Sequence, residues 1–298
     1  SSAVIIGAGA IALEFASMWN AAGSKVTLLI RKDRVLSAWD RRAGTTLTRE
    51  LKRHGVNIIT RASVTHVDTG ANLGATVHYT REGQDGEQSV WGEIALVAIG
   101  RDPITDPAWG VTIDDHGHVA TDAYGRTDKP GVWAVGDVTA GHALAHRAFE
   151  QGIVIAETIA GLNPKPVDEA TVPQIVFSFP EAASVGLTVE QAQAREDLIE
   201  IKETNYPMLA NARMLMSGEG GSMTVVSGAF ANNPDMQVVL GVHIVSPIAS
   251  DLIAEAEQLV GNRVPLADAA RLIHPHPKFS ETLGEALLKA DGRPLHTR

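Results

Sequence analysis

The sequence contains no cysteine among its 298 residues. The chain therefore cannot form a disulfide, a thiolate metal site or a cysteine nucleophile. It also lacks any apolar run near the roughly 20 residues that a membrane-spanning helix needs. Stretches such as Val238 to Val245 are far shorter. These absences predict a protein with neither a membrane span nor a thiolate metal site.

Positive charge is also in short supply. The chain has 25 Lys and Arg against 35 Asp and Glu, a formal net charge of -10. This balance argues against nucleic acid as the main partner. The first residues carry no basic stretch ahead of an apolar one, as a signal peptide would, so we expect a cytoplasmic protein. The length suffices for two compact domains.

The beginning of the chain follows the order strand, turn, helix, strand. Ser2 to Ile6 is a β-branched apolar run, Ala10 to about Ala22 repeats with helical period, and Lys25 to Ile30 is again β-rich. Together they form a βαβ unit of about 30 residues. Strands and helices alternate to Ile99 and then mix. The sequence thus predicts a Rossmann-type α/β domain followed by an α+β domain.

A glycine-rich turn joins the first strand to the first helix. Residues 7–12, GAGAIA, fit the pattern G-x-G-x-x-G/A. Gly7 permits the tight turn, Gly9 lets a pyrophosphate approach the backbone, and the small Ala12 lets helix pack on strand. The phosphates would then lie at the helix N-terminus, where free N–H groups favour negative charge. The turn predicts a dinucleotide site.

The residues after the second strand bear on the choice between NAD and NADP. An NAD site usually has Asp or Glu there, for the ribose hydroxyls. This chain has Arg31 and Lys32, which suit the additional phosphate of NADP better. Asp33 follows and could serve a ribose. The sequence leaves both nucleotides open.

Two later segments also have the character of sites. A β-rich run, Gly131 to Val135, delivers Gly136 and Asp137 to the end of a strand, where open α/β folds bind ligands. Near the C-terminus, His276 lies between two prolines, which restrict its backbone. Glu281 could hold one of its ring nitrogens, the arrangement of a base and its orienting group.

These segments resemble the pyridine nucleotide–disulfide oxidoreductases, and the resemblance covers essentially the whole chain. The family's motif "HxHPxxSE", typical of dihydrolipoamide dehydrogenases, places an acid–base histidine at His276 and its orienting carboxylate at Glu281. Residues 127–137 are similar to the second FAD motif, whose aspartate binds the ribityl chain. The resemblance implies these cofactor-binding residues: Gly7, Gly9, Ala12, Glu14, Arg31, Lys32, Gly100, Arg101, Gly136, Asp137, Leu144, Ala145 and His146.

The resemblance also implies an organisation and an activity. We expect an NAD(P)-binding domain over 1–122, a residual piece of an FAD-binding domain over 123–163 and a dimerisation domain over 164–298, in a homodimer. Electrons would pass between a small dithiol or disulfide, such as lipoamide, and NAD or NADP through FAD. A 2-oxo acid dehydrogenase complex is a partner that this activity allows.

The family's first G-x-G-x-x-G and its C-x4-C disulfide do not occur in the 298 residues. We therefore expect the C-terminal portion of a longer enzyme, inactive by itself. Two alternatives stay open. Arg31 and Lys32 favour an NADPH-dependent reductase of the glutathione or mycothione type. The absence of cysteine favours a non-catalytic, dimeric NAD(P)H-binding module, against which the His276 and Glu281 motif argues.

Overall fold

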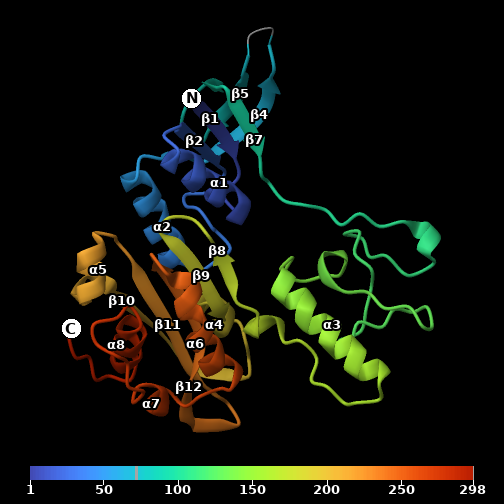
Figure 1. The fold of residues 1–298 in the computed structure, drawn as a ribbon, viewed down its shortest axis with the longest axis vertical. Helices are drawn as coiled ribbons and strands as arrows, with labels where there is room; N and C mark the ends of the chain where they lie inside the picture. The colour runs from blue at the N-terminus through green and yellow to red at the C-terminus, as the bar shows by residue number, and fades with distance from the viewer. Residues whose placement is uncertain (71–72, 298) are drawn as a thin grey trace. The chain divides into compact units, whose positions relative to one another are not determined.

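The computed structural model describes residues 1–70 and 73–297. They form two compact units (Figure 1). Unit 1 comprises residues 1–99 together with the chain from Pro173 onward, and unit 2 comprises Gly100–Val172. These limits differ from the expected ranges 1–122, 123–163 and 164–298. The expected α/β and α+β parts lie together in unit 1.

The α/β part of unit 1 is built on a parallel sheet in the order β3-β2-β1-β7. Its elements are β1 (Ser2–Ile6), α1 (Ala10–Ala21), β2 (Lys25–Ile30), α2 (Arg41–Arg53), β3 (Asn57–Thr60) and β7 (Ile94–Val97). The predicted βαβ unit is confirmed. Helix α2 begins before Thr45, where its apolar period suggests a start, because the Asp40 carboxylate caps it by accepting the Ala43 N–H at 2.8 Å.

A second, antiparallel sheet follows in the order β4-β5-β6, with β4 (Ala62–Asp68), β5 (Ala75–Arg81) and β6 (Gln88–Gly92). One face packs on the parallel sheet, where Val77 and Tyr79 join Val4 and Leu29 in one apolar cluster. The alternation along β5 is therefore apolar inward and polar outward.

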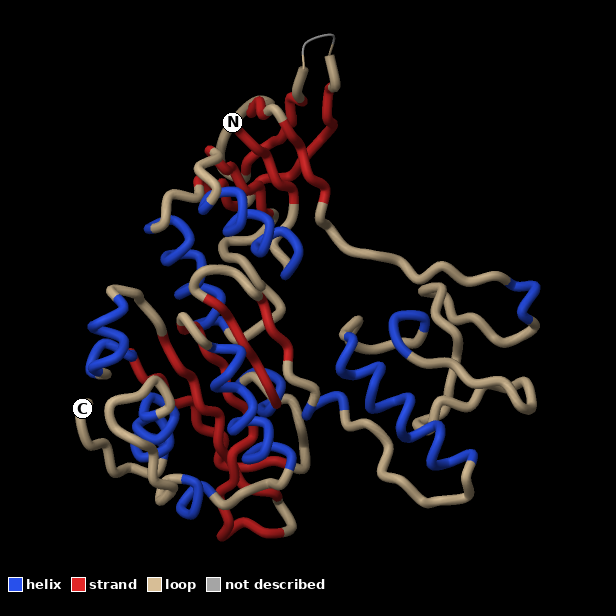
Figure 2. The backbone as a smooth tube through the Cα atoms, viewed as in Figure 1, coloured by secondary structure: helices blue, strands red, loops and turns tan. Residues whose placement is uncertain are grey.

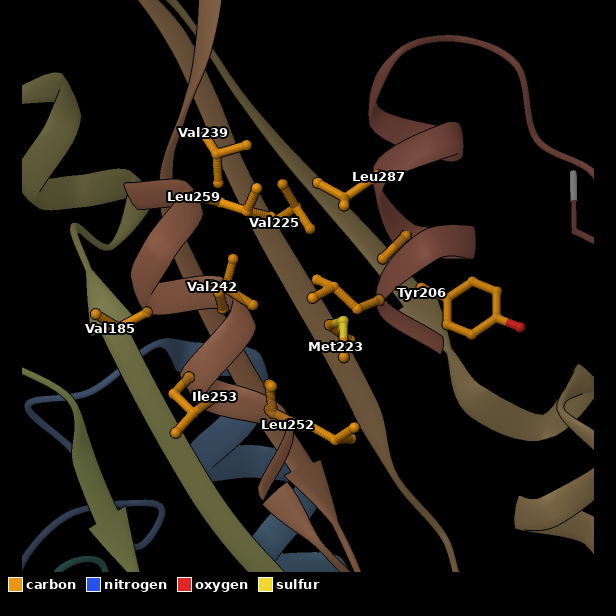
Figure 3. Packing of buried hydrophobic residues seen from close by; sticks show 14 of the residues in the cluster. Val185, Tyr206, Met223, Val225, Val239, Val242, Leu252, Ile253, Leu259 and Leu287 are labelled. Carbon is orange, nitrogen blue, oxygen red and sulfur yellow. The ribbon is translucent and has the colours of Figure 1, made fainter. Parts of the chain in front are cut away.

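The α+β part of unit 1 contains a five-stranded antiparallel sheet in the order β10-β11-β12-β9-β8 (Figure 2). Its strands are β8 (Gln174–Val176), β9 (Glu181–Gly186), β10 (Leu198–Pro207), β11 (Ser222–Phe230) and β12 (Asn233–Ser246). Its helices are α4 (Val189–Gln193), α5 (Ala212–Ser217), α6 (Ala249–Gly261), α7 (Leu266–Ala269) and α8 (Glu281–Ala290). Figure 3 shows Val225 and Met223 of the sheet packed between α6 and α8.

The two parts of unit 1 share buried contacts. Leu47 and Leu51 of α2 belong to one apolar cluster with Val176 and Val245 of the antiparallel sheet. Polar contacts accompany them: the Ser222 hydroxyl lies 3.1 Å from that of Thr46, and the Thr224 hydroxyl donates to Asp40 at 3.3 Å. The C-terminal part thus contributes Val176, Ala182 and Val245 to a cluster whose other buried residues come from the nucleotide-type part.

Unit 2 consists of α3 (Ala145–Ile159), three single-turn 3₁₀ helices and irregular chain. The sequence predicts a helix from Leu144 to Ala160, which α3 confirms, but the predicted strand from Gly131 to Val135 is wrong. Within Gly100–Val172 the β pairing is limited to the isolated bridges Ile113–Val119 and Arg126–Trp133. An extended segment becomes a strand only when a neighbour pairs with it over several residues. Here the pairing stops at one bridge, with the Ala134 N–H donating to Gly125 and the Thr127 N–H donating to Val132.

The helices also bear on the membrane expectation. Over residues 1–70 and 73–297, each helix is too short or too polar to cross a lipid bilayer.

Candidate functional site

The turn between β1 and α1 has the form that a dinucleotide requires. Gly7 has φ +138°, and a Cβ there would lie 2.1 Å from the carbonyl oxygen of Ala98. Only glycine fits this approach. Gly9 differs: its φ is -91°, and a Cβ would meet nothing within 4 Å. The backbone at Gly9 therefore borders open space in front of the helix.

Helix α1 presents its N-terminus to that space. Its N-cap, Gly9, contributes no side-chain cap, and its first turn carries no acidic residue. The N–H groups and the positive end of the helix dipole are thus left for an anion. Ala12 is fully buried behind the turn, where it closes the contact of helix with strand. These features fit the pyrophosphate of a dinucleotide.

The charged residues after β2 are exposed and differ in their partners. The Asp33 carboxylate contacts the guanidinium groups of Arg34 at 3.2 Å and Arg41 at 3.6 Å. Arg31 and Lys32 form no ion pair with any residue that the structure describes. The cations at this strand end are therefore open to an added phosphate, while the carboxylate is engaged by two arginines.

Glu14, expected at the cofactor, has a contact within the chain. Its Oε1 accepts the backbone N–H of Phe177 at 3.0 Å. One turn further on α1, the Ser17 hydroxyl accepts the N–H of Phe179 at 3.1 Å. Both contacts attach α1 to the segment after β8, so Glu14 serves the internal packing of unit 1.

The expected flavin-side residues lie in unit 2. Gly136 is buried and donates its N–H to Gln151 of α3 at 2.8 Å, which holds the turn 136–138 against that helix. The Asp137 side chain is exposed beside it. Leu144 is the N-cap of α3, and Ala145 and His146 begin the helix. Gly100 and Arg101 open the unit and are exposed.

His276 and Glu281 are brought together as predicted by their spacing. His276 Nδ1 lies 2.7 Å from Glu281 Oε1, while Glu281 Oε2 accepts the N–H of Lys278 at 2.7 Å. The His276 side chain is 75% exposed. Its Nε2 has no hydrogen-bond partner in the described part of the chain. The ring is thus held at one nitrogen and open at the other.

The electrostatics keep Glu281 ionised. Its partial burial opposes ionisation, but the hydrogen bonds from the Lys278 N–H and the His276 ring outweigh it and lower the pKa of Glu281. A carboxylate beside Nδ1 fixes the tautomer in which Nδ1 carries hydrogen. Nε2 is then the atom that can take up or release a proton.

Other contacts hold the loop that carries His276, and the sequence did not indicate them. His274 Nε2 lies 2.9 Å from Glu255 Oε1 on α6, and this hydrogen bond, opposed by burial, raises the pKa of His274. The Asn211 amide donates to the Lys278 carbonyl at 3.0 Å. The Arg213 guanidinium lies over the Phe279 ring. These partners are distant along the chain, so no local pattern marks them.

The two sets of residues occupy different regions of unit 1. The turn before α1 lies beside the parallel sheet, whereas the His276 loop precedes α8 on the antiparallel sheet (Figure 1). The arrangement provides an anion site at a helix N-terminus and, apart from it, a proton-exchanging histidine.

The chain matches known proteins along its length. A family profile described as pyridine nucleotide-disulphide oxidoreductase matches residues 1–152, and that family's dimerisation domain matches residues 172–287. The dihydrolipoyl dehydrogenase of Cupriavidus necator is 38% identical over 98% of the chain and 60% of its own length. That of Bacillus subtilis is 35% identical over 99% and 61%.

Solved structures agree. LpdA from Mycobacterium tuberculosis has a TM-score of 0.84 at 28% identity, over 97% of this chain and 61% of its own. The HOCl-induced flavoprotein disulfide reductase RclA from Escherichia coli has a TM-score of 0.81 at 26% identity, over 96% and 64%. The chain thus spans about three fifths of the length of its curated relatives.

These matches agree with the site geometry. Dihydrolipoyl dehydrogenases and their family use FAD and NAD(P). The anion-binding turn falls within the first matched segment and the histidine pair within the second. The chain belongs to the pyridine nucleotide-disulphide oxidoreductases, and its C-terminal part is that family's dimerisation domain.

Proposed function

We propose that the chain is the nucleotide-binding and dimer-forming part of a dihydrolipoyl dehydrogenase, which transfers electrons between a small dithiol and NAD(P) through FAD. The observation that carries the proposal is the His276–Glu281 pair, with Nδ1 held at 2.7 Å and Nε2 facing outward. The names of the relatives support the choice of dithiol.

His276 would manage the protons. Oxidation of a dithiol to a disulfide releases two electrons and two protons, and reduction of NAD(P)⁺ consumes both electrons and one proton. Nε2 of His276 accepts a thiol proton, and the Glu281 carboxylate stabilises the imidazolium that forms. The hydrogen bond from the Lys278 N–H to Glu281 holds the carboxylate beside the His276 ring. The flavin and the nicotinamide carry the electron pair when they are bound.

The nucleotide would lie with its pyrophosphate at Gly9 and the N-terminus of α1. In unit 2, the exposed Asp137 carboxylate can accept a hydrogen bond from a ribityl hydroxyl, and Leu144 to His146 would line the flavin from the start of α3. In a homodimer of this family, His276 would act at the flavin site of the partner subunit.

One observation favours a second candidate, an NADPH-dependent disulfide reductase of the glutathione or mycothione type. Arg31 and Lys32 form no ion pair with a described residue, while Asp33 is engaged by Arg34 and Arg41. This arrangement suits a 2′-phosphate better than a free ribose.

The test of the proposal is turnover of dihydrolipoamide by the full-length protein. His276→Gln is expected to lower kcat by roughly 100-fold or more, the scale of a positioned acid–base group, and Glu281→Gln by less. His296→Gln is the matched control, because His296 also pairs with a glutamate, Glu285, at 2.8 Å. Wild-type rates in both the His276 and Glu281 variants would show that the pair is not catalytic.

A further inference from the structure

A group of titratable side chains outside the proposed function lies on the β4-β5-β6 sheet of unit 1. His66, Asp68 and His78 each offer a ligand atom, and these atoms all lie within 4.8 Å of one another. The His78 side chain is 23% exposed, that of His66 50% and that of Asp68 64%. The group is open to solvent and is not part of the apolar cluster beneath the sheet.

A β-bulge places the two histidines face to face. Val64 pairs with Tyr79, and His66 pairs with His78. The chain thus advances two residues along β4 but only one along β5, and Thr65 is the extra residue of the bulge. Without that extra residue, His66 would oppose Val77 and point inward with it. Bulges re-aim side chains in this way. Asp68, two residues beyond His66, then faces the same side.

The geometry gives both rings the same two neighbours. The imidazoles stack with centroids 4.1 Å apart and planes 8° apart. On one side, Asp68 Oδ2 lies 3.2 Å from His78 Nε2 and 3.7 Å from His66 Nε2. On the other side, Glu87 lies 3.5 Å from His78 Nδ1 and 3.9 Å from His66 Nδ1.

We propose that His66, His78 and Asp68 form a binding site for a divalent transition-metal ion of the zinc and copper class. Two imidazoles and a carboxylate are ligands that such ions prefer. An ion centred among three atoms no more than 4.8 Å apart can lie within about 3 Å of each. Small rotations of these exposed side chains would reach the ligand distances of about 2.0–2.2 Å.

Glu87 lies on the side of the two imidazole rings that faces away from the proposed ion. A histidine that binds a metal donates its other ring N–H to a carboxylate or carbonyl, which fixes the tautomer. Glu87 stands on the Nδ1 side of both rings and so leaves both Nε2 atoms to the ion. The Thr65 hydroxyl donates to Glu87 at 2.7 Å, so the bulge residue also positions this carboxylate. Three protein ligands leave a fourth coordination position for water or an external ligand.

The test is calorimetric titration of the metal-free chain with ZnCl₂ and, separately, CuCl₂. The chain contains no cysteine, so no thiolate competes. We expect one saturable site per chain that His66→Asn or His78→Asn weakens about 100-fold and Glu87→Gln about tenfold, the range known for outer partners. The ion should also raise the Tm of the wild type but not of the histidine variants, because it joins β4 to β5.

His116→Asn is the control for adventitious binding, since His116 is an exposed histidine of unit 2. Thermal unfolding without metal verifies that each variant keeps its fold. The proposal is overturned if neither ion binds stoichiometrically, or if the site retains its affinity in the His66 and His78 variants or loses it equally in His116→Asn.

Discussion

At the scale of single residues, Gly7 and Gly9 are glycines for different reasons. Gly7 must be one for the fold, because its backbone passes against the Ala98 carbonyl with φ +138°. Gly9 has an ordinary φ and free space where a Cβ would lie, so the fold does not require glycine there. The remaining reason for glycine at position 9 is the open space that it leaves in front of the first N–H groups of α1.

This contrast gives a prediction. Gly9→Ala should leave the unfolding transition unchanged but weaken NADH and NADPH by about tenfold or more, the value of one hydrogen bond to a charged group. Gly7→Ala should instead destabilise the fold. Gly152→Ala is the matched control, since a Cβ there also meets nothing within 4 Å. Calorimetry measures the affinities, and unchanged binding in Gly9→Ala would rule out a pyrophosphate at this turn.

The residues after β2 give a second prediction. Arg31→Glu should weaken NADPH by about tenfold through the loss of a charged hydrogen bond, and NADH by much less. Lys25→Glu applies the same charge change to an exposed residue at the other end of β2 and should affect neither. Parallel titrations with both nucleotides decide the matter. Equal effects of Arg31→Glu on the two would make Arg31 a surface charge only.

At the scale of elements, the loop before α8 is held by a partly buried pair. His274 contacts Glu255 of α6 at 2.9 Å and leaves only 9% of its side chain exposed. Its ring lies so close to α8 that a Cβ on Gly284 would stand 2.5 Å from Nδ1. The absence of a side chain at Gly284 thus lets α6, the loop and α8 meet.

The pair predicts a pH-dependent stability. Folding raises the pKa of His274, so its contribution is complete below the unfolded value of about 6.5 and is lost as pH rises through the folded value. His274→Gln should therefore cost about 1–2 kcal/mol near pH 6 and little near pH 9. Urea unfolding at both pH values measures this.

Two further variants check the cause of that pH dependence. Glu255→Gln removes the partner, and Gly284→Ala displaces the ring from it. Each should reduce the same pH dependence. A wild-type profile in both variants would assign it to another group.

Local patterns predict the elements whose signals are local, such as β1, α1, β2 and, from Glu281 to Ala290, α8. The sequence did not predict strand β9, because Ala182, Ala183 and Ser184 have low β-propensity. They are extended through their pairing with β8 and β12. The sequence did not predict strand β10 either, because a register shift between Ile199 and Lys202 interrupts its alternation of inward and outward side chains. Both depend on partners distant in sequence.

The residues of the candidate site likewise divide into those that a local pattern predicts and those that depend on partners distant in sequence. His276 and Glu281 could be predicted because five residues separate them and the geometry is a property of one loop. Glu255 could not, since α6 brings it from 19 residues away. The cross-strand pairing of His66 with His78 depends on a bulge that alternation of polar and apolar residues does not reveal.

At the scale of the whole molecule, we expect a homodimer in which the loop before α8 lies at the interface. Ile273, three residues before His276, is 97% exposed, which is unusual for an isoleucine that no partner covers. Ile273→Asp should shift the dimer toward monomer at tens of micromolar in sedimentation velocity and, in the full-length protein, lower turnover with it. Leu73→Asp, at a residue 95% exposed in the hairpin, is the control. A wild-type chain that sediments as a monomer would contradict the expectation.

Unit 1 is assembled from two stretches separated by the 73 residues of Gly100–Val172. This order has a consequence for synthesis on the ribosome. The cluster that contains Leu47 and Leu51 of α2 also includes Val245, so this cluster is complete only after that part of the chain has emerged. At about 5–20 residues per second, the wait lasts on the order of ten seconds or more. Throughout it, Leu47 and Leu51 face solvent or whatever chaperone reaches the nascent chain first.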